Sequence, residues 1–169
     1  MKKVIFIPFD FRNTYHCECL ENMLSDYFDE TFINNPHDKV PKHFIPKLLK
    51  IIGEEIEKYK EWLYLCAIDD LFIGFSVFQI DTPDNPMSKR EGWGFIREFY
   101  IVPSYRRKGF AKQMCGFVEK KLLEDRPCNI YLTSDPCNGI PFWEAMGYIY
   151  SGKVDDKNGN KIYEKYFPV

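Results

Sequence analysis

Hydrophobic residues along this chain follow two periods, one typical of helices and one typical of strands. Apolar residues recur every three or four positions in three segments, which predict helices beginning near Thr14, around Pro46 and directly after Gly109. A short fourth helix is predicted over residues 139–146. Runs of β-branched and aromatic residues predict strands over residues 3–8, 62–68, 71–80, 97–102, 129–134, 148–154 and 161–167.

The connections between these elements contain residues that break regular structure. Residues 69–70 and the Asn-Gly pair at 158–159 predict the tight turns of two β-hairpins. Residues 31–42 are rich in asparagine and proline and predict a loop. Residues 81–92 hold two prolines and five charged residues and predict a mobile loop. Because no repeat or linker divides the chain, we predict a single mixed α/β domain over residues 1–169.

Composition and charge exclude several classes of protein. The chain has 169 residues, of which 45% are hydrophobic, a content far from that of a disordered chain. Its formal net charge of −2 gives no reason to expect binding to nucleic acid or to an acidic membrane. The apolar run at the start is broken by Pro8 and Asp10, which is too short for a signal peptide or a membrane span, so we predict a cytoplasmic protein. The six cysteines include no C-x-x-C pair, and they predict a reducing compartment and no metal site.

A cationic turn, Arg106-Arg107-Lys108-Gly109, lies between the strand at 97–102 and the helix that follows it. The unpaired amides of a first helical turn point outward, and the helix dipole adds about half a positive charge there. Gly109 lets an anion approach the backbone closely. These features predict a phosphate site, although a solvated connection is the alternative reading of the same residues.

Two blocks of sequence on either side of residues 129–134 carry a more specific pattern. The first reads as a strand E-F-Y-I-V-P followed by Y-R and K-G-x-A, with Glu98, Phe99, Tyr100, Ile101, Pro103, Tyr105, Arg106, Lys108, Gly109 and Ala111 as its residues. The second comprises Ile140, Pro141, Phe142, Trp143, Glu144, Ala145, Met146, Gly147 and Tyr148. In this order the blocks resemble the acetyl-CoA-binding core and the A-x-x-F-Y-x-x-x-G-F segment of the GNAT superfamily of N-acetyltransferases. The resemblance covers roughly residues 60 to 150.

The resemblance implies a fold and a cosubstrate. The fold would be α/β (α+β), with a mixed, mostly antiparallel, twisted central sheet of about six to seven strands and about four flanking helices. The cosubstrate would be acetyl-CoA, its pyrophosphate held by the amides of residues 106–111. In the family the fourth strand splays from the fifth at a bulge, which makes the amide of Ile101 or Val102 the candidate donor to the thioester carbonyl. The predicted cofactor-binding residues are Ile101, Val102, Arg106, Arg107, Lys108, Gly109, Phe110, Ala111 and Trp143.

Glu98 is the candidate general base. An alkylamine with a pKa near 10.4 is about 3.4 pH units from neutrality at pH 7, so its free base costs roughly 4.6 kcal/mol to supply. A carboxylate beside the amine, acting directly or through one water, can take that proton. Glu98 matches a position where the family often has a glutamate base, and alternation would put it on one face of its strand with Tyr100. The alternative is a structural carboxylate paired with Arg97 or Lys108.

This chain departs from the family pattern at the general acid. The family commonly has a tyrosine where this chain has Trp143, and an indole N–H is far too weak an acid to protonate a sulfur. Trp143 then packs as an aromatic wall against pantetheine or the core. The candidate acids are Tyr148, which is our choice, then Tyr150 or water. A thiol with a pKa near 8.5 can also leave as its thiolate.

The resemblance implies acetyl-CoA-dependent N-acetylation of a primary amine, by direct attack in a ternary complex. The acceptor would be a small molecule or a peptide, with no nucleic acid or membrane as partner, and the protein a monomer or a homodimer. Residues 10–40, residues 81–92 and the last hairpin would form the acceptor pocket. The alternative function is that of a non-catalytic acyl-CoA-binding sensor or partner module, which Trp143 favours and Glu98 does not.

Overall fold

The structure is a computed structural model that describes residues 2–33, 37, 40–134 and 139–168. In that part of the chain, seven strands form one sheet, and four α-helices and two short 3₁₀ helices connect them. The elements in chain order are β1 (Ile5–Pro8), α1 (Thr14–Thr31), η2 (Lys42–Phe44), α2 (Ile45–Lys58), β2 (Glu61–Ile68), β3 (Leu71–Ile80), β4 (Gly94–Ile101), η3 (Pro103–Tyr105), α3 (Phe110–Glu124), β5 (Ile130–Ser134), α4 (Ile140–Ala145), β6 (Ile149–Val154) and β7 (Lys161–Lys165). The predicted strands and helices are confirmed, and β4 begins three residues earlier than its prediction.

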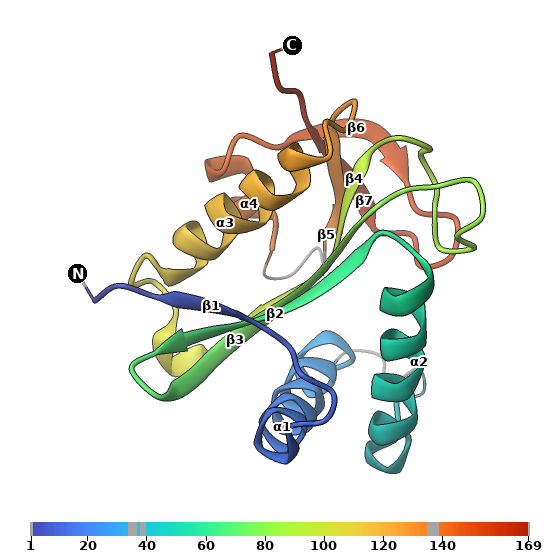
Figure 1. The fold of residues 1–169 in the computed structure, drawn as a ribbon. Helices are drawn as coiled ribbons and strands as arrows, with labels where there is room; N and C mark the ends of the chain where they lie inside the picture. The colour runs from blue at the N-terminus through green and yellow to red at the C-terminus, as the bar shows by residue number, and fades with distance from the viewer. Residues whose placement is uncertain (1, 34–36, 38–39, 135–138, 169) are drawn as a thin grey trace.

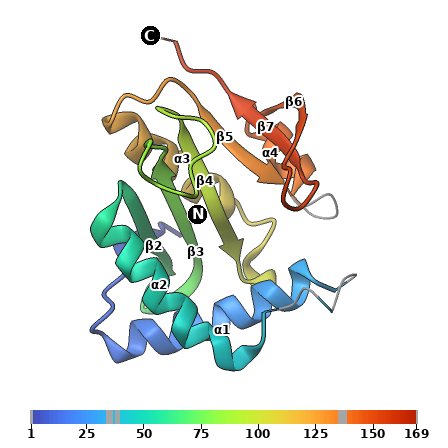
Figure 2. The ribbon, with the colours of Figure 1, turned by 90° about the vertical axis from the view of Figure 1, so that its right-hand side faces the viewer.

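The sheet is mixed and mostly antiparallel, as predicted. Its strand order is β1-β2-β3-β4-β5-β7-β6, and β4 with β5 is its parallel pair. Helices α1 and α2 cover one face, and α3 and α4 cover the other (Figure 1). The view in Figure 2 shows α2 crossing in front of β2 and β3 and α1 running along the bottom, with the β6–β7 hairpin at the upper right.

Local sequence explains where the helices begin. The side chain of Asn13 accepts a hydrogen bond from the amide of His16, which caps α1. Pro46 and Pro141 lie in the first turns of α2 and α4, where a proline costs no helical hydrogen bond. Helix α3 instead follows Gly109, whose φ of 81° is in the left-handed region.

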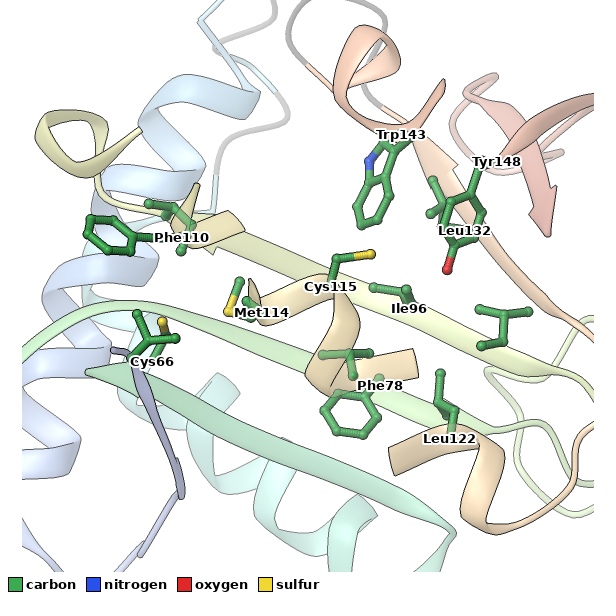
Figure 3. Packing of buried hydrophobic residues seen from close by; sticks show 14 of the residues in the cluster. Cys66, Phe78, Ile96, Phe110, Met114, Cys115, Leu122, Leu132, Trp143 and Tyr148 are labelled. Carbon is green, nitrogen blue, oxygen red and sulfur yellow. The ribbon is translucent and has the colours of Figure 1, made fainter. Parts of the chain in front are cut away.

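Two hydrophobic cores lie on the opposite faces of the sheet. The core under α3 and α4 includes Phe78, Ile96, Met114, Leu122, Trp143 and Tyr148 (Figure 3). The core under α1 and α2 includes Leu20, Leu24, Leu49, Phe75, Val77 and Tyr100. Alternate residues of the central strands enter the two cores, as a sheet buried on both faces requires.

The alternation fails at one place in β4. Val77 of β3 is opposite Glu98, and the next residue, Phe78, is opposite Ile96, so Arg97 is an extra residue in β4. This is a β-bulge. The parallel pairing of β4 with β5 also stops here, at Ile96 opposite Leu132. Beyond this point one edge of β4 has no neighbouring strand in the described sheet.

Residues 81–92, predicted to be a mobile loop, form several hydrogen bonds to a buried carboxylate. The buried carboxylate of Asp81 accepts hydrogen bonds from the amides of Lys89 and Arg90, each at 2.9 Å, and from the Tyr131 hydroxyl at 2.6 Å. The segment leads into the first residue of β4. It therefore lies at the opposite end of that strand from the cationic turn.

Candidate active site

The cationic turn leaves a run of backbone amides available. The amides of Tyr105 and Arg106 donate to the carbonyls of Val102 and Pro103, at 2.9 and 3.1 Å. For the amides of residues 107–112, by contrast, no acceptor is found among the described residues. Positive φ angles at Arg107 (57°) and Gly109 (81°) turn the backbone so that consecutive amides can converge. The turn and the first turn of α3 thus have the chemistry of an anion site.

Two of the cationic side chains in this turn, predicted to aid the amides in binding phosphate, contact other groups of the protein. Arg106 lies 2.8 Å from both carboxylate oxygens of Glu30 and 2.8 Å from the carbonyl of Ile101. Lys108 donates to the carbonyl of Ser104 at 2.9 Å. Arg106 therefore ties α1 to the end of β4. The backbone amides, rather than these two side chains, remain the predicted phosphate ligands.

The bulge exposes polar backbone groups along the second half of β4. The amide of Val102 donates to the carbonyl of Ile73 at 2.8 Å, so Val102 faces β3 and is not available as an oxyanion donor. Backbone groups of successive strand residues point to opposite sides. Ile101 and Phe99 consequently face the edge from which β5 has departed. Of the two predicted oxyanion donors, Ile101 is the one whose amide faces this open edge. The amide of Phe99 faces it as well, and sequence reasoning missed this residue.

Glu98 lies on the face of β4 that α1 and α2 cover, together with Tyr100 as predicted. The Tyr27 hydroxyl of α1 donates to Glu98 Oε2 at 2.6 Å, and the Tyr27 ring contacts the Tyr100 ring at 5.6 Å between centroids. Burial raises the pKa of the Glu98 carboxyl, while the hydrogen bond from Tyr27 and the charge of Arg97 act in the opposite direction. A carboxylate held at one oxygen and made more basic by burial has the properties of a general base.

Arg97 does not pair with Glu98 in an ion pair. Its guanidinium lies 2.9 Å from Glu55 of α2 and 2.8 Å from Glu61 of β2, and all three side chains are largely buried. Burial raises the pKa of Glu61 to about 7, against the lowering effect of Arg97. Sequence reasoning missed Tyr27, Glu55 and Glu61. They come from other elements, and no local pattern marks them.

An apolar cavity of about 150 Å³ lies beside Glu98, between α1, α2 and the sheet. It is lined by Leu20, Leu24, Phe28, Val40, Leu48, Ile52, Leu63, Phe75, Val77, Arg97 and Glu98. Part of the predicted acceptor region, residues 10–40, contributes to this lining. Among the described residues, none of 81–92 or of the β6–β7 hairpin does so.

A family model described as the acetyltransferase (GNAT) family matches residues 20–148, most of the chain. The chain belongs to the GNAT acetyltransferase family. The match includes α1 from residue 20 onward and all of α2, as well as the two blocks recognised in the sequence. No curated protein sequence matches significantly.

Solved structures show the same GNAT fold at low sequence identity. The PaiA N-acetyltransferase of Thermoplasma acidophilum, solved in complex with coenzyme A, is 17% identical with a TM-score of 0.68, and the alignment covers 98% of this chain and 99% of that one. An acetyltransferase from Thermus thermophilus is 14% identical with a TM-score of 0.72, covering 99% and 100%. An aminoglycoside 6′-N-acetyltransferase complexed with coenzyme A is 15% identical with a TM-score of 0.68, covering 98% of both chains.

Two residues of the second sequence block, Trp143 and Tyr148, are buried. Trp143 is 6% exposed and packs edge-on against Phe99. It also packs edge-on against Tyr148 (Figure 3). Tyr148 is 2% exposed. Burial raises the pKa of its hydroxyl, and the neighbouring Cys115 and Glu119 raise it further. Such a group is a poor proton donor to a substrate, so its position argues against the predicted role of Tyr148 as general acid.

Two further observations concern metal ligands and membrane-spanning helices. Across the described ranges, no group of three or more His, Cys, Asp or Glu side chains gathers as a metal ion would require. No described helix combines the length and the apolarity needed to cross a membrane.

Proposed function

We propose that this GNAT family member transfers the acetyl group of acetyl-CoA to a primary amine, by direct attack within a ternary complex, with Glu98 as general base. The observation that carries the proposal is the position of Glu98 on the stretch of β4 that β5 leaves open. An amine that approaches from the α1–α2 side meets this carboxylate directly beside the open edge.

The residues present fit acetyl-CoA. The available amides of residues 107–112 can hold a pyrophosphate, and the left-handed Gly109 presents no side chain to it. Ile101 and Phe99 offer backbone groups along the open edge for an extended pantetheine and for a carbonyl oxygen. When bound there, acetyl-CoA supplies the acetyl thioester that the family uses.

Glu98 can meet the most costly requirement of the reaction, which is the conversion of the ammonium substrate into a neutral amine. About 4.6 kcal/mol separates an alkylammonium from its free base at pH 7. Because burial raises its pKa, the Glu98 carboxylate holds a proton better than an exposed glutamate would. The hydrogen bond from Tyr27 fixes one of its oxygens, which leaves the other to face the amine.

The departing thiol needs no tyrosine in this proposal. A thiol with a pKa near 8.5 leaves as its thiolate at modest cost. Trp143, packed against Phe99, forms a rigid wall behind the open edge. We therefore assign no proton-donor role to Tyr148.

Two measurements test the proposal. Isothermal titration calorimetry should detect coenzyme A binding, and thiol release should rise with time when acetyl-CoA and a primary amine are both present. Binding without turnover across a broad amine panel would instead support a non-catalytic acyl-CoA-binding module. If coenzyme A does not bind at all, both readings are wrong.

A further inference from the structure

The cavity beside Glu98 combines an apolar interior with charge at one side. Nine of its lining residues are apolar and come from α1, α2, β2, β3 and residue 40. The charged lining residues, Arg97 and Glu98, both belong to β4. A ligand in this cavity would thus have its polar end at β4 and its apolar end under the two helices.

Of these two charged groups, Glu98 is the one that can receive a cation. Arg97 is neutralised by Glu55 and Glu61, at 2.9 and 2.8 Å. Glu98 accepts a hydrogen bond from Tyr27 but has no ion-pair partner among the described residues. Around Arg97 there are thus three carboxyl groups, those of Glu55, Glu61 and Glu98, and a single guanidinium. This excess of carboxyl groups favours a bound ammonium.

The size of the cavity limits the apolar end of such a ligand. Protein interiors contain few voids larger than a water molecule, so an apolar hollow of about 150 Å³ is unusual as mere packing. An engineered protein cavity of about the same volume, lined by Leu, Ile and Phe, stays dry and binds benzene. The space therefore suits one aromatic ring or an alkyl tail of about six carbons.

Building on the proposed function, we propose that the acceptor is a primary amine with a compact apolar tail, an arylalkylamine or a medium-length alkylamine. The ammonium lies at Glu98, and the tail fills the cavity between α1, α2 and the sheet. Polyamines and aminoglycosides would place a second charge or several hydroxyls against apolar side chains, at a large desolvation cost. The specificity of the enzyme then comes from the α1–α2 side.

An amine series tests this directly. Along the linear alkylamines from ethylamine to hexylamine, kcat/KM should rise about four-fold per methylene, because each buried methylene contributes about that factor. The rise should stop near six carbons, and phenethylamine should match the best alkylamine. The diamine 1,6-diaminohexane should be at least 100-fold worse than hexylamine. A flat series, or a preference for the diamine, would overturn the proposal and leave the acetyltransferase function intact.

A matched pair of variants on α2 locates the specificity in the cavity. Leu48 lines the cavity and is half-buried, so Leu48→Phe narrows it with little risk to folding. Ile51, 36% exposed, does not line it and gives the control Ile51→Phe. The ratio of kcat/KM for hexylamine to that for ethylamine should fall at least ten-fold in Leu48→Phe and stay constant in Ile51→Phe. Equal ratios in the two variants would contradict the assignment.

Binding without acetyl-CoA separates failure of this inference from failure of the proposed function. Phenethylamine and ethylbenzene should each raise the melting temperature of the wild-type protein, and Leu48→Phe should reduce both shifts. Binding without turnover would support the cavity inference and refute the catalytic proposal. Turnover of polar amines with no shift from either aromatic probe would refute the cavity inference alone.

Discussion

Replacing Glu98 by glutamine separates its proposed role in catalysis from a structural one. Glutamine has nearly the same shape, and its amide oxygen can still accept the hydrogen bond that Tyr27 donates at 2.6 Å. Glu98 forms no ion pair in the described structure, so its replacement leaves no cation unpaired. We therefore expect the variant to fold and to bind coenzyme A as the wild type does, while losing the ability to accept a proton.

The expected loss of activity follows from the protonation of the amine. With a pKa near 10.4, about one alkylamine molecule in 2,500 is neutral at pH 7. A general base typically contributes 100- to 10,000-fold, so kcat/KM of Glu98→Gln at pH 7 should fall by about 100- to 1,000-fold, or roughly 3–4 kcal/mol. Because solution then has to supply the free amine, log kcat/KM of the variant should rise by about one per pH unit up to the pKa of the amine.

The assay is thiol release as a function of pH with a saturating acetyl-CoA concentration. In the wild type, the acidic limb of kcat/KM should report the Glu98 carboxyl, whose pKa burial raises above its ordinary value. Tyr27→Phe removes a hydrogen bond that lowers this pKa, so its acidic limb should move to higher pH while Glu98→Gln loses the limb altogether. A loss below three-fold in Glu98→Gln, with an unchanged pH profile, would refute the assignment of Glu98 as base.

Four further predictions concern stability and cosubstrate binding. Gly109→Ala should weaken coenzyme A binding in calorimetry and lower the melting temperature by a few degrees, because φ is 81° there and a side chain costs about 1–2 kcal/mol. Gly116→Ala, in α3 with nothing within 4 Å of an added Cβ, should instead raise the melting temperature. Gly74→Ala should destabilise by about 2–3 kcal/mol in urea unfolding, because its Cβ would lie 2.4 Å from the Tyr100 carbonyl oxygen. Glu61 has a folded pKa of about 7 against 4.5, so wild-type stability should fall by up to about 3 kcal/mol as pH rises through this window, and Glu61→Gln should flatten that slope in thermal scans.

The elements of the fold could be predicted because their signals are local. Helical and strand periods depend on neighbouring residues, and the turn before α3 is recognisable from the glycine and the residues around it. The family pattern then supplied the sheet, the open edge and the position of Glu98. Of the predicted amides of residues 106–111, that of Arg106 donates to the carbonyl of Pro103, and those of residues 107–111 have no acceptor among the described residues. Their binding of phosphate stays a prediction.

The partners of the site residues could not be predicted, because they come from distant parts of the chain. Glu30 and Arg106 are 76 residues apart, and Tyr27 and Glu98 are 71 apart. The sequence predicted that the side chain of Arg106 aids phosphate binding, and it could not reveal that this side chain also joins α1 to the end of β4. Val102 was a wrong choice of donor for a similar reason, since the side to which an amide points depends on strand register.

A single structural irregularity accounts for both the open edge and the position of the base. Ile96 faces α3, so strict alternation would put Glu98 on the same face, inside the core that contains Met114. The extra residue Arg97 shifts the alternation, and Glu98 faces Tyr27 of α1 instead. The same bulge coincides with the end of pairing between β4 and β5. Since bulges commonly redirect side chains and end strand pairing, the sheet itself places a carboxylate beside an open strand edge, and helices α1 and α2 then determine which amine can reach it.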